Sequence, residues 1–244
     1  PTTHLIKGVL REHTNSELDI YLFDTITKRD TNDPYLKEIQ NLPVTYIYIG
    51  QLSFDEMIRC TLQKNIDVAV DLMGHAENQI TSKIFSSRIA TAQINYLGFP
   101  GTTGSREIHD FIIADDIVIP KEHEKYYCEK VVRISGCYQC NDNKKSIADP
   151  QILGSKEPVL EKAEFVFCCF NNIWKITSRE FDIWMRLLQR NPGSILWLRS
   201  EINIVIENLQ FQAKARNIDP DRLIFAKKVD MAAHLARHQK ADLF

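Results

Sequence analysis

The chain has 244 residues, 44% of them hydrophobic, so it is long enough for one large domain or two of ordinary size. Its formal net charge of −2 excludes the strongly basic surface that is typical of proteins that bind nucleic acids. The sequence contains no apolar run of the roughly 20 residues that span a membrane and no signal peptide, so we expect neither a membrane nor a nucleic acid as a partner.

Short apolar runs alternate with helical patterns along the chain. The runs that predict strands are residues 18–23, 44–49, 68–72, 93–96, 111–114, 131–134, 165–170, 194–198 and 222–225. Two capping boxes predict helix starts, one from Ser53 to Glu56 and one from Thr177 to Glu180. Apolar residues then repeat at helical spacing, as Phe181, Trp184, Leu187 and Leu188 in one segment and as Ile202, Val205, Ile206, Leu209 and Ala213 in another. This alternation indicates an α/β protein with mostly parallel sheets.

Residues 141–161 are the best candidate for a linker, because they are polar and contain Pro150, Gly154 and Pro158. Strands and helices alternate again after them, so we expect two domains, residues 1–155 and residues 156–244. A ligand shared by two open α/β domains is expected in the cleft between them. The chain starts at residue 1 without a methionine and stops in an apolar segment, which predicts a fragment of a longer protein.

The most informative loop follows the predicted strand 93–96. Three of the nine glycines fall at Gly98, Gly101 and Gly104, with Pro100 between them. Glycine lets backbone N–H groups approach a ligand, and such groups bind phosphates or sugar hydroxyls. The loop matches neither the Walker pattern nor the dinucleotide pattern, so a plain turn stays an alternative. We expect a side chain at Gly98 to meet the ligand or to strain the backbone, and Gly98→Val to abolish function while the fold survives.

Lys175 follows the predicted strand 165–170 and precedes the capping box at Thr177, which predicts a place at the N-terminus of the next helix. A cation there favours a phosphate together with the helix dipole, and a solvated surface lysine is the alternative. His234 and Arg237 lie three residues apart on a predicted short helix, where both can contact a base or a phosphate. His234 and His238 have the spacing of a zinc pair, but no third ligand is evident.

His75 lies at the carboxyl end of the predicted strand 68–72, where sites of open α/β sheets gather. Histidine suits proton transfer near neutral pH, and a structural histidine is the alternative. Four other histidines have no comparable context: His4, His13, His109 and His123.

Six cysteines are present, and Cys137 and Cys140 have the spacing of a redox pair or of half a zinc site. A second pair is missing and the residues that follow predict a loop, so unpaired thiols of a cytoplasmic protein are the favoured interpretation. We therefore expect no metal.

These segments, in this order, resemble the catalytic region of the O-linked N-acetylglucosamine transferase family, or glycosyltransferase family 41, particularly its bacterial members. The resemblance covers nearly the whole chain and departs from the family at single positions, such as Ala76 for Thr and Cys140 for a loop Pro. The matching segments are residues 71–75 with "DLxGHT", 93–104 with "QxxWLGYPGTSG", 137–142 with "CYQPND", 170–176 with "FNQxYKI" and 191–198 with "xPxSxLWL".

The resemblance implies two Rossmann-like lobes of the GT-B type. Residues 1–155 would form the acceptor-side lobe, and residues 156–244 would begin the nucleotide-sugar-binding lobe, which is then incomplete. The implied activity is transfer of a sugar, N-acetylglucosamine, from a uridine diphosphate donor to Ser or Thr of an acceptor protein or peptide. It needs no metal and no cofactor, and the resemblance implies tetratricopeptide repeats upstream.

The resemblance also assigns roles to residues. Lys175 would contact the diphosphate, with Asn172 beside it, and a fixed cation there would stabilise the charge on the leaving group. His234 and Arg237 would lie near the uridine. The sugar pocket would be lined by Leu97, Gly98 and Pro100, and His75 is the candidate base.

Other functions stay open. Met231 stands where the family has a lysine near the uridine, which favours a non-catalytic module that binds a nucleotide-sugar or a protein. Some relatives act on Asn, so glucosyl transfer to Asn is a second alternative. A redox protein that uses Cys137 and Cys140 is a third.

Overall fold

The computed structural model describes residues 2–13, 17–30, 32–75, 80–149 and 160–244. The chain divides into two compact units, Pro1–Lys144 and Lys145–Phe244, and each is described by itself. The domain boundary expected between residues 155 and 156 lies outside the described residues and stays a prediction.

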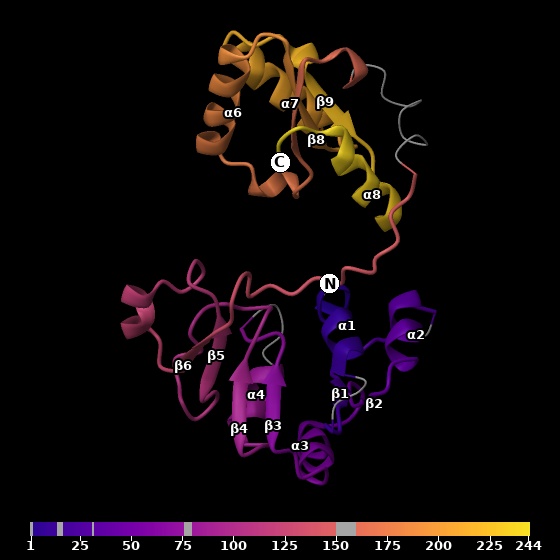
Figure 1. Ribbon diagram of the computed structural model, residues 1–244, viewed down its shortest axis with the longest axis vertical. Helices are drawn as coiled ribbons and strands as arrows, with labels where there is room; N and C mark the ends of the chain where they lie inside the picture. The colour runs from indigo at the N-terminus through magenta and orange to yellow at the C-terminus, as the bar shows by residue number, and fades with distance from the viewer. Residues whose placement is uncertain (1, 14–16, 31, 76–79, 150–159) are drawn as a thin grey trace. The chain divides into compact units, whose positions relative to one another are not determined.

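In the first unit, parallel strands alternate with helices (Figure 1). Its elements are α1 (Thr2–Glu12), β1 (Tyr21–Asp24), α2 (Pro34–Gln40), β2 (Thr45–Tyr48), α3 (Phe54–Leu62), β3 (Val68–Asp71), α4 (Ile80–Ser86), β4 (Ala92–Asn95), β5 (Phe111–Ala114), the 3-10 helix η2 (Lys121–Tyr126) and β6 (Lys130–Arg133). They form a two-stranded sheet β1-β2 and a four-stranded sheet β3-β4-β5-β6, with every pairing parallel.

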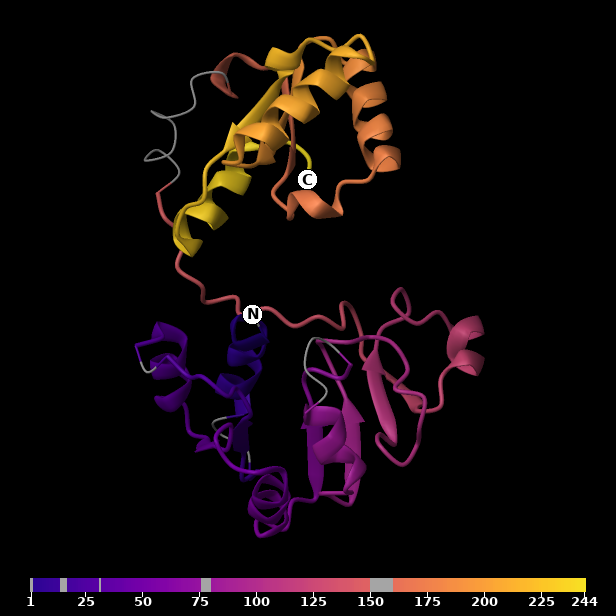
Figure 2. The ribbon, with the colours of Figure 1, turned by 180° about the vertical axis from the view of Figure 1, so that it is seen from behind.

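The second unit has one parallel sheet, in the order β7-β8-β9. Its elements are η3 (Leu160–Lys162), β7 (Phe165–Cys169), η4 (Ile173–Lys175), α6 (Ser178–Arg190), β8 (Ser194–Arg199), α7 (Asn203–Lys214), η5 (Pro220–Arg222), β9 (Leu223–Ala226), α8 (Met231–Arg237) and η6 (His238–Lys240). Figure 2 shows the same elements from behind. All nine predicted strands overlap observed ones, so the α/β class with parallel sheets is confirmed.

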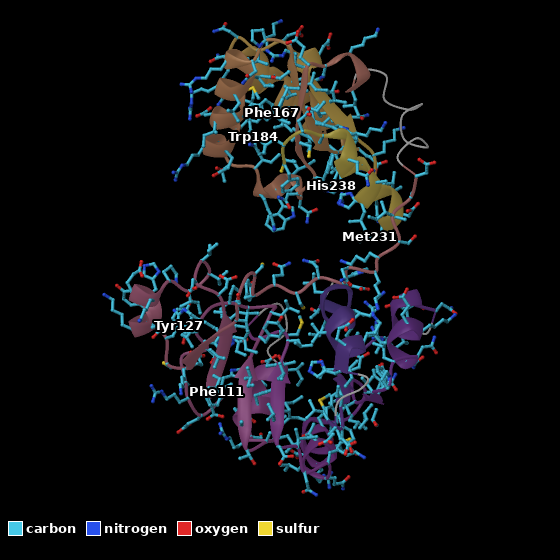
Figure 3. All side chains as sticks on the ribbon, in the orientation of Figure 1. Phe111, Tyr127, Phe167, Trp184, Met231 and His238 are labelled. Carbon is cyan, nitrogen blue, oxygen red and sulfur yellow. The ribbon has the colours of Figure 1, made fainter. Side chains whose placement is uncertain are left out.

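Helix α6 covers the sheet of the second unit with the apolar face that its sequence predicts. Phe181 and Leu188 are buried against Leu196 and Leu198 of β8. The partly buried Phe167 and Trp184, labelled in Figure 3, pack against this cluster. Burying side chains of this size contributes about 1.5–3 kcal/mol each, so this packing rather than helix propensity holds α6 in place.

The expected apolar face of α7 is only partly correct. Ala213 is fully buried, but Ile202 is 57% exposed. The helix begins after Ile202, which is its N-cap residue, so the side chain of Ile202 precedes the face that meets the core. The predicted apolar face therefore extended one turn too far toward the N-terminus.

Both capping boxes mark helix starts as predicted. Glu56 accepts hydrogen bonds from the N–H of Ser53 at 2.8 Å and from its hydroxyl at 2.6 Å, at the start of α3. The hydroxyl of Thr177 contacts the carboxylate of Glu180 at the start of α6. The carboxylate at the third helical position thus binds back to the capping residue, which fixes where the chain enters each helix.

Helix α1 is tied to the loop after β6 by a buried carboxylate. Asp142 has a fully buried side chain, with Oδ1 2.5 Å from Arg11 Nη2 and Oδ2 3.2 Å from Lys7 Nζ. The hydrogen bond from Arg11 holds the pKa of Asp142 well below its ordinary value, although burial opposes the shift. A carboxyl group whose pKa is lower in the folded state stabilises the fold above its unfolded pKa, and this stabilisation is lost as the pH falls.

We therefore expect Asp142→Asn to lower the free energy of unfolding by about 1.5–3 kcal/mol at pH 7, where a hydrogen-bonded charge is lost. The difference from the unchanged protein should shrink below pH 4, because Asp142 is then protonated in the unfolded chain. Denaturant unfolding at pH 7 and pH 3 measures both. Equal destabilisation at the two pH values would contradict the role of the charge.

Candidate active site

The loop after β4 is held from inside by a buried amide. Asn95 has no exposed surface, and its Nδ2 donates to the carbonyl oxygens of Phe99 at 3.0 Å and Gly101 at 3.2 Å. Leu97 has a φ of 78°, which for a bulky residue costs about 1–3 kcal/mol and persists only where the surroundings enforce it. Such strain is typical of loops shaped for a ligand.

Of the three residues expected in the sugar pocket, two are accessible. Gly98 and Pro100 are exposed, whereas Leu97 is 5% exposed and packs in a cluster with Ile6, Tyr96 and Tyr138. A contact from Leu97 to a sugar would thus come from its backbone, since its side chain is part of the core.

Gly98 is required by a close approach of two backbone segments. A Cβ on Gly98 would overlap the carbonyl oxygen of Leu72 and would lie 3.3 Å from Met73 Cα. A side chain at Gly98 would therefore meet backbone and strain it, the second of the two expectations, and we expect it to cost stability.

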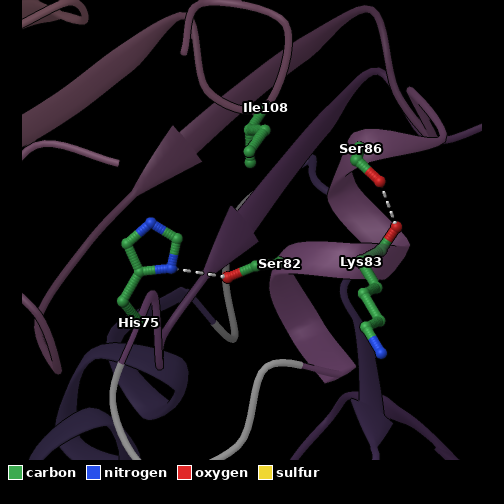
Figure 4. Close-up of a pocket in the computed structure, with 5 residues that line it drawn as sticks. All are labelled: His75, Ser82, Lys83, Ser86 and Ile108. Carbon is green, nitrogen blue, oxygen red and sulfur yellow. Dashed lines mark hydrogen bonds between the residues drawn. The ribbon is translucent and has the colours of Figure 1, made fainter. Parts of the chain in front are cut away.

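His75 lies in the same region, at the carboxyl end of β3. Its Nε2 is 3.2 Å from the carbonyl oxygen of Thr103, and its Nδ1 is 3.2 Å from Ser82 Oγ. The ring meets the edge of Phe99, with centroids 5.5 Å apart. His75 and Ser82 line a hollow of about 270 Å³ together with Lys83, Ser86 and Ile108 (Figure 4). The structure therefore brings His75 to the glycine loop, as its place after β3 predicted.

In the second unit, the residues expected near the uridine gather around Phe170, which follows β7. The ring of His234 lies 5.8 Å from that of Phe170, and the guanidinium carbon of Arg237 lies 5.3 Å from it. Arg237 is 3% exposed and donates to the carbonyl oxygen of Lys227 at 3.0 Å. Burial lowers the pKa of His234, and the charges of His238 and Arg237 add to this effect. His234 is thus favoured in its neutral form.

Asn172 and Lys175 belong to the turn η4 after the same strand. Asn172 is the N-cap of η4, and its backbone carbonyl oxygen accepts a hydrogen bond from the N–H of Lys175 at 3.0 Å. Lys175 is exposed, and its Nζ lies 5.5 Å from the centre of the Trp174 ring. Lys175 is the last residue of η4 and lies two residues before Thr177, the N-cap of α6.

The predicted residues thus form two sets. His75 joins the loop of Leu97, Gly98 and Pro100 in the first unit. Asn172, Lys175, His234 and Arg237 form the second set, at the carboxyl end of β7. Among the described residues, no group of three or more His, Cys, Asp or Glu could hold a metal ion.

Sequence reasoning missed several residues of these sites. His109 was set aside, yet it is fully buried 3.3 Å from the carboxylate of Asp71. Glu129 is 3% exposed and binds the loop at Thr102 and Thr103. No local pattern marks either residue, because their partners are distant in sequence. Trp174 is 78% exposed, and its ring lies 5.5 Å from Lys175 Nζ. Its place next to Lys175 in the sequence could have marked it as a candidate.

The Cys137–Cys140 pair lies in a loop, as predicted, and all six cysteines are free thiols. The thiol of Cys140 donates to the carbonyl oxygen of Leu5 at 3.3 Å. None of the helices in the described part of the chain combines the length and the apolar character that crossing a bilayer requires.

Comparisons with known proteins cover the whole chain. A family model described as glycosyl transferase family 41 matches residues 1–157 and 155–244. The chain is 28% identical over 247 residues to the probable UDP-N-acetylglucosamine–peptide N-acetylglucosaminyltransferase SEC of Arabidopsis thaliana, which covers 100% of this chain and 25% of that protein. It is 27% identical over 199 residues to the SPINDLY protein of the same plant, which carries the same enzyme description, covering 80% of this chain and 21% of that protein.

A solved structure of a mutant of the Thermobaculum terrenum O-GlcNAc transferase superposes with a TM-score of 0.82. The two sequences are 22% identical, and the match covers 99% of this chain and 45% of that one. At this identity the likeness shows the fold alone. The chain spans about a quarter of the length of the curated relatives it matches.

Proposed function

The chain belongs to glycosyl transferase family 41, and from this premise we propose that the protein containing it transfers N-acetylglucosamine from a uridine diphosphate donor to Ser or Thr of acceptor proteins. The relatives named above are described as enzymes that act on UDP-N-acetylglucosamine and peptides. One observation carries the proposal: His234 and Arg237 meet Phe170 at the carboxyl end of β7, the strand that Asn172 and Lys175 follow. Sites of parallel α/β sheets form at that end of the strands.

In this reaction the bond between the sugar and the diphosphate breaks, and a bond from the sugar to the acceptor hydroxyl forms. Negative charge develops on the leaving diphosphate, and the ammonium group of Lys175 would stabilise it. His234 and Arg237 would hold the uridine. Lys175 would thus supply the positive charge that a metal ion could otherwise supply to the diphosphate, so we propose that neither a metal nor a cofactor takes part.

On the acceptor side, the hydroxyl proton must leave as the new bond forms. We propose His75 as its acceptor, with the loop of Gly98 and Pro100 against the sugar. A tetratricopeptide segment upstream and a cytoplasmic location stay predictions, and the six free thiols support the second.

The proposed donor site is tested by Lys175→Ala in the full-length protein. We expect uridine diphosphate to bind about tenfold more weakly or worse, because a charge-assisted hydrogen bond is lost. Turnover should fall further if the contact tightens in the transition state. Titration calorimetry measures the affinity. Lys214→Ala is the matched control, since Lys214 is an exposed lysine at the far end of α7. Unchanged affinity and turnover for Lys175→Ala would remove Lys175 from the site.

A screen of uridine diphosphate sugars with Ser, Thr and Asn peptides decides between the alternatives. Transfer of N-acetylglucosamine to Ser or Thr supports the proposal. Transfer of glucose to Asn supports the alternative of an Asn-directed glucosyltransferase. Donor binding without turnover on any acceptor supports a non-catalytic module.

A further inference from the structure

A buried carboxylate holds the end of the glycine loop. Glu129 Oε1 accepts the N–H of Thr103 at 2.6 Å and also the hydroxyl of Thr103, and Oε2 accepts the hydroxyl of Thr102 at 2.7 Å. Burial alone would raise the pKa of Glu129, but these hydrogen bonds outweigh it and lower the pKa. Glu129 is therefore an ionised acceptor, and it takes the hydroxyl proton of Thr103.

Thr103 in turn contacts His109, the next member of this hydrogen-bond network. The hydrogen of Thr103 Oγ1 points to Glu129, so the oxygen can only accept from His109 Nδ1, which lies 3.2 Å away. The other nitrogen, Nε2, lies 3.3 Å from Asp71 Oδ2. His109 therefore links the hydroxyl of Thr103 to the buried carboxylate of Asp71. Burial would raise the pKa of Asp71, but the hydrogen bonds from His109 and the backbone outweigh it and lower the pKa.

The two ends of this network, Asp71 and Thr103, both act on the position of His75. Asp71 Oδ1 accepts the N–H of Gly74 at 3.0 Å, which fixes the backbone just before His75. Thr103 is fixed through its N–H and its hydroxyl, and its carbonyl oxygen lies 3.2 Å from His75 Nε2. A carbonyl oxygen only accepts, so the proton of His75 is on Nε2 and the lone pair is on Nδ1.

The lone pair on Nδ1 faces Ser82 Oγ, which also lies 3.1 Å from the carbonyl oxygen of Gly74. The hydroxyl of Ser82 can donate to Nδ1 while that nitrogen is free. When Nδ1 gains a proton, the hydroxyl can turn to Gly74 and accept from Nδ1 instead. His75 thus keeps a hydrogen-bond partner in both states, as a group that takes up and returns a proton requires.

We propose that Asp71, Thr103, His109 and Glu129 form a positioning unit that fixes His75 as the tautomer protonated on Nε2. The four residues are buried, so we expect them to act through His75 and not on the substrate directly. The proposal rests on the function proposed above only in the use made of His75; the tautomer itself follows from the contacts.

Nitrogen-15 NMR of the full-length protein with labelled histidine tests the proposal, with the signals of His75 assigned by their absence from His75→Gln. We expect a single population protonated on Nε2 in the unchanged protein. Thr103→Val has nearly the same shape but lacks the hydroxyl, so the Glu129 and His109 contacts to it are lost and His75 should show a mixture of tautomers. Thr103→Ser restores the hydroxyl and should restore the single population.

A matched control separates positioning from a general loss of stability. Asp24 is another buried carboxylate at a strand end, bound to Tyr46 and Arg29. Asp24→Asn should lower the melting temperature without changing the His75 signals. The proposal is overturned if His75 is protonated on Nδ1 in the unchanged protein, if Thr103→Val leaves the tautomer unchanged, or if Asp24→Asn alters it equally.

Kinetics supply a second readout. Thr103→Val should lower kcat about tenfold to a hundredfold, the range expected for a misplaced reacting group, with KM for the donor unchanged. A change confined to KM for the donor would contradict positioning of His75. If His75→Gln itself kept full activity, the function proposed for His75 would fail while the tautomer result still stood.

Discussion

We expect His75→Gln in the full-length protein to lower kcat by about a hundredfold to ten-thousandfold, the contribution of general base catalysis. His75 is exposed and lines the hollow beside the glycine loop, with its Nδ1 3.2 Å from Ser82 Oγ. Glutamine fills a similar volume and keeps an N–H for the carbonyl oxygen of Thr103, so the loop should retain its shape. Affinity for uridine diphosphate should stay unchanged, because the residues proposed to bind the diphosphate and the uridine belong to the second unit.

Steady-state transfer of a labelled sugar to an acceptor peptide measures this effect. His123→Gln is the control, since His123 is an exposed histidine of the same unit in η2, in ring contact with Tyr126. It should leave kcat unchanged. A kcat for His75→Gln within a factor of about three of the unchanged protein corresponds to less than 1 kcal/mol and would exclude His75 as the base.

The second large effect is on stability. Gly98→Val should lower the free energy of unfolding by about 3 kcal/mol or more, at the upper end of the cost of overpacking a well-packed site. The added Cβ would overlap the carbonyl oxygen of Leu72, which is backbone between β3 and His75 and cannot move without displacing the sheet end. Alanine carries the same Cβ, so Gly98→Ala should also destabilise the protein without any ligand.

Gly104→Asn is the control from the same loop. Gly104 has a φ of +79° and open space around it, and asparagine tolerates this conformation better than other residues. Its cost should be small. Thermal unfolding without donor measures all three variants. A Gly98→Ala protein as stable as the unchanged one but weaker in donor binding would show that the ligand, rather than Leu72, requires glycine here.

The strands were predictable because each is a short apolar run of consecutive residues, which can be recognised without knowing its partner strands. Residues 68–70 and 165–169 are such runs, although Val68 and Val70 stay 52% and 43% exposed in the folded chain. The starts of α3 and α6 were predictable for the same reason, since each capping box needs only four consecutive residues. The first and last residues of an apolar pattern are weaker evidence for where a helix begins or ends, as the exposed Ile202 before α7 shows.

The candidate residues were found where the signal was local or came from the resemblance. His75 follows a strand, and Lys175 follows another, which is where ligands of α/β sheets bind. The two reasons expected for Gly98, a ligand and a strained backbone, stayed open, because the sequence shows that a position lacks a side chain but not what occupies the space. Only the approach of Leu72 decides between a ligand and backbone there.

The sequence by itself determined the α/β class, the nine strands and the place of His75 after β3, because each depends on neighbouring residues. The tertiary structure decided which side chains meet across long separations: Asp71 with His109, Thr103 with Glu129, and Phe170 with Arg237. The first two of these contacts belong to the unit that we propose to position His75. A hydrogen bond depends on distance and direction, and only the folded chain fixes both.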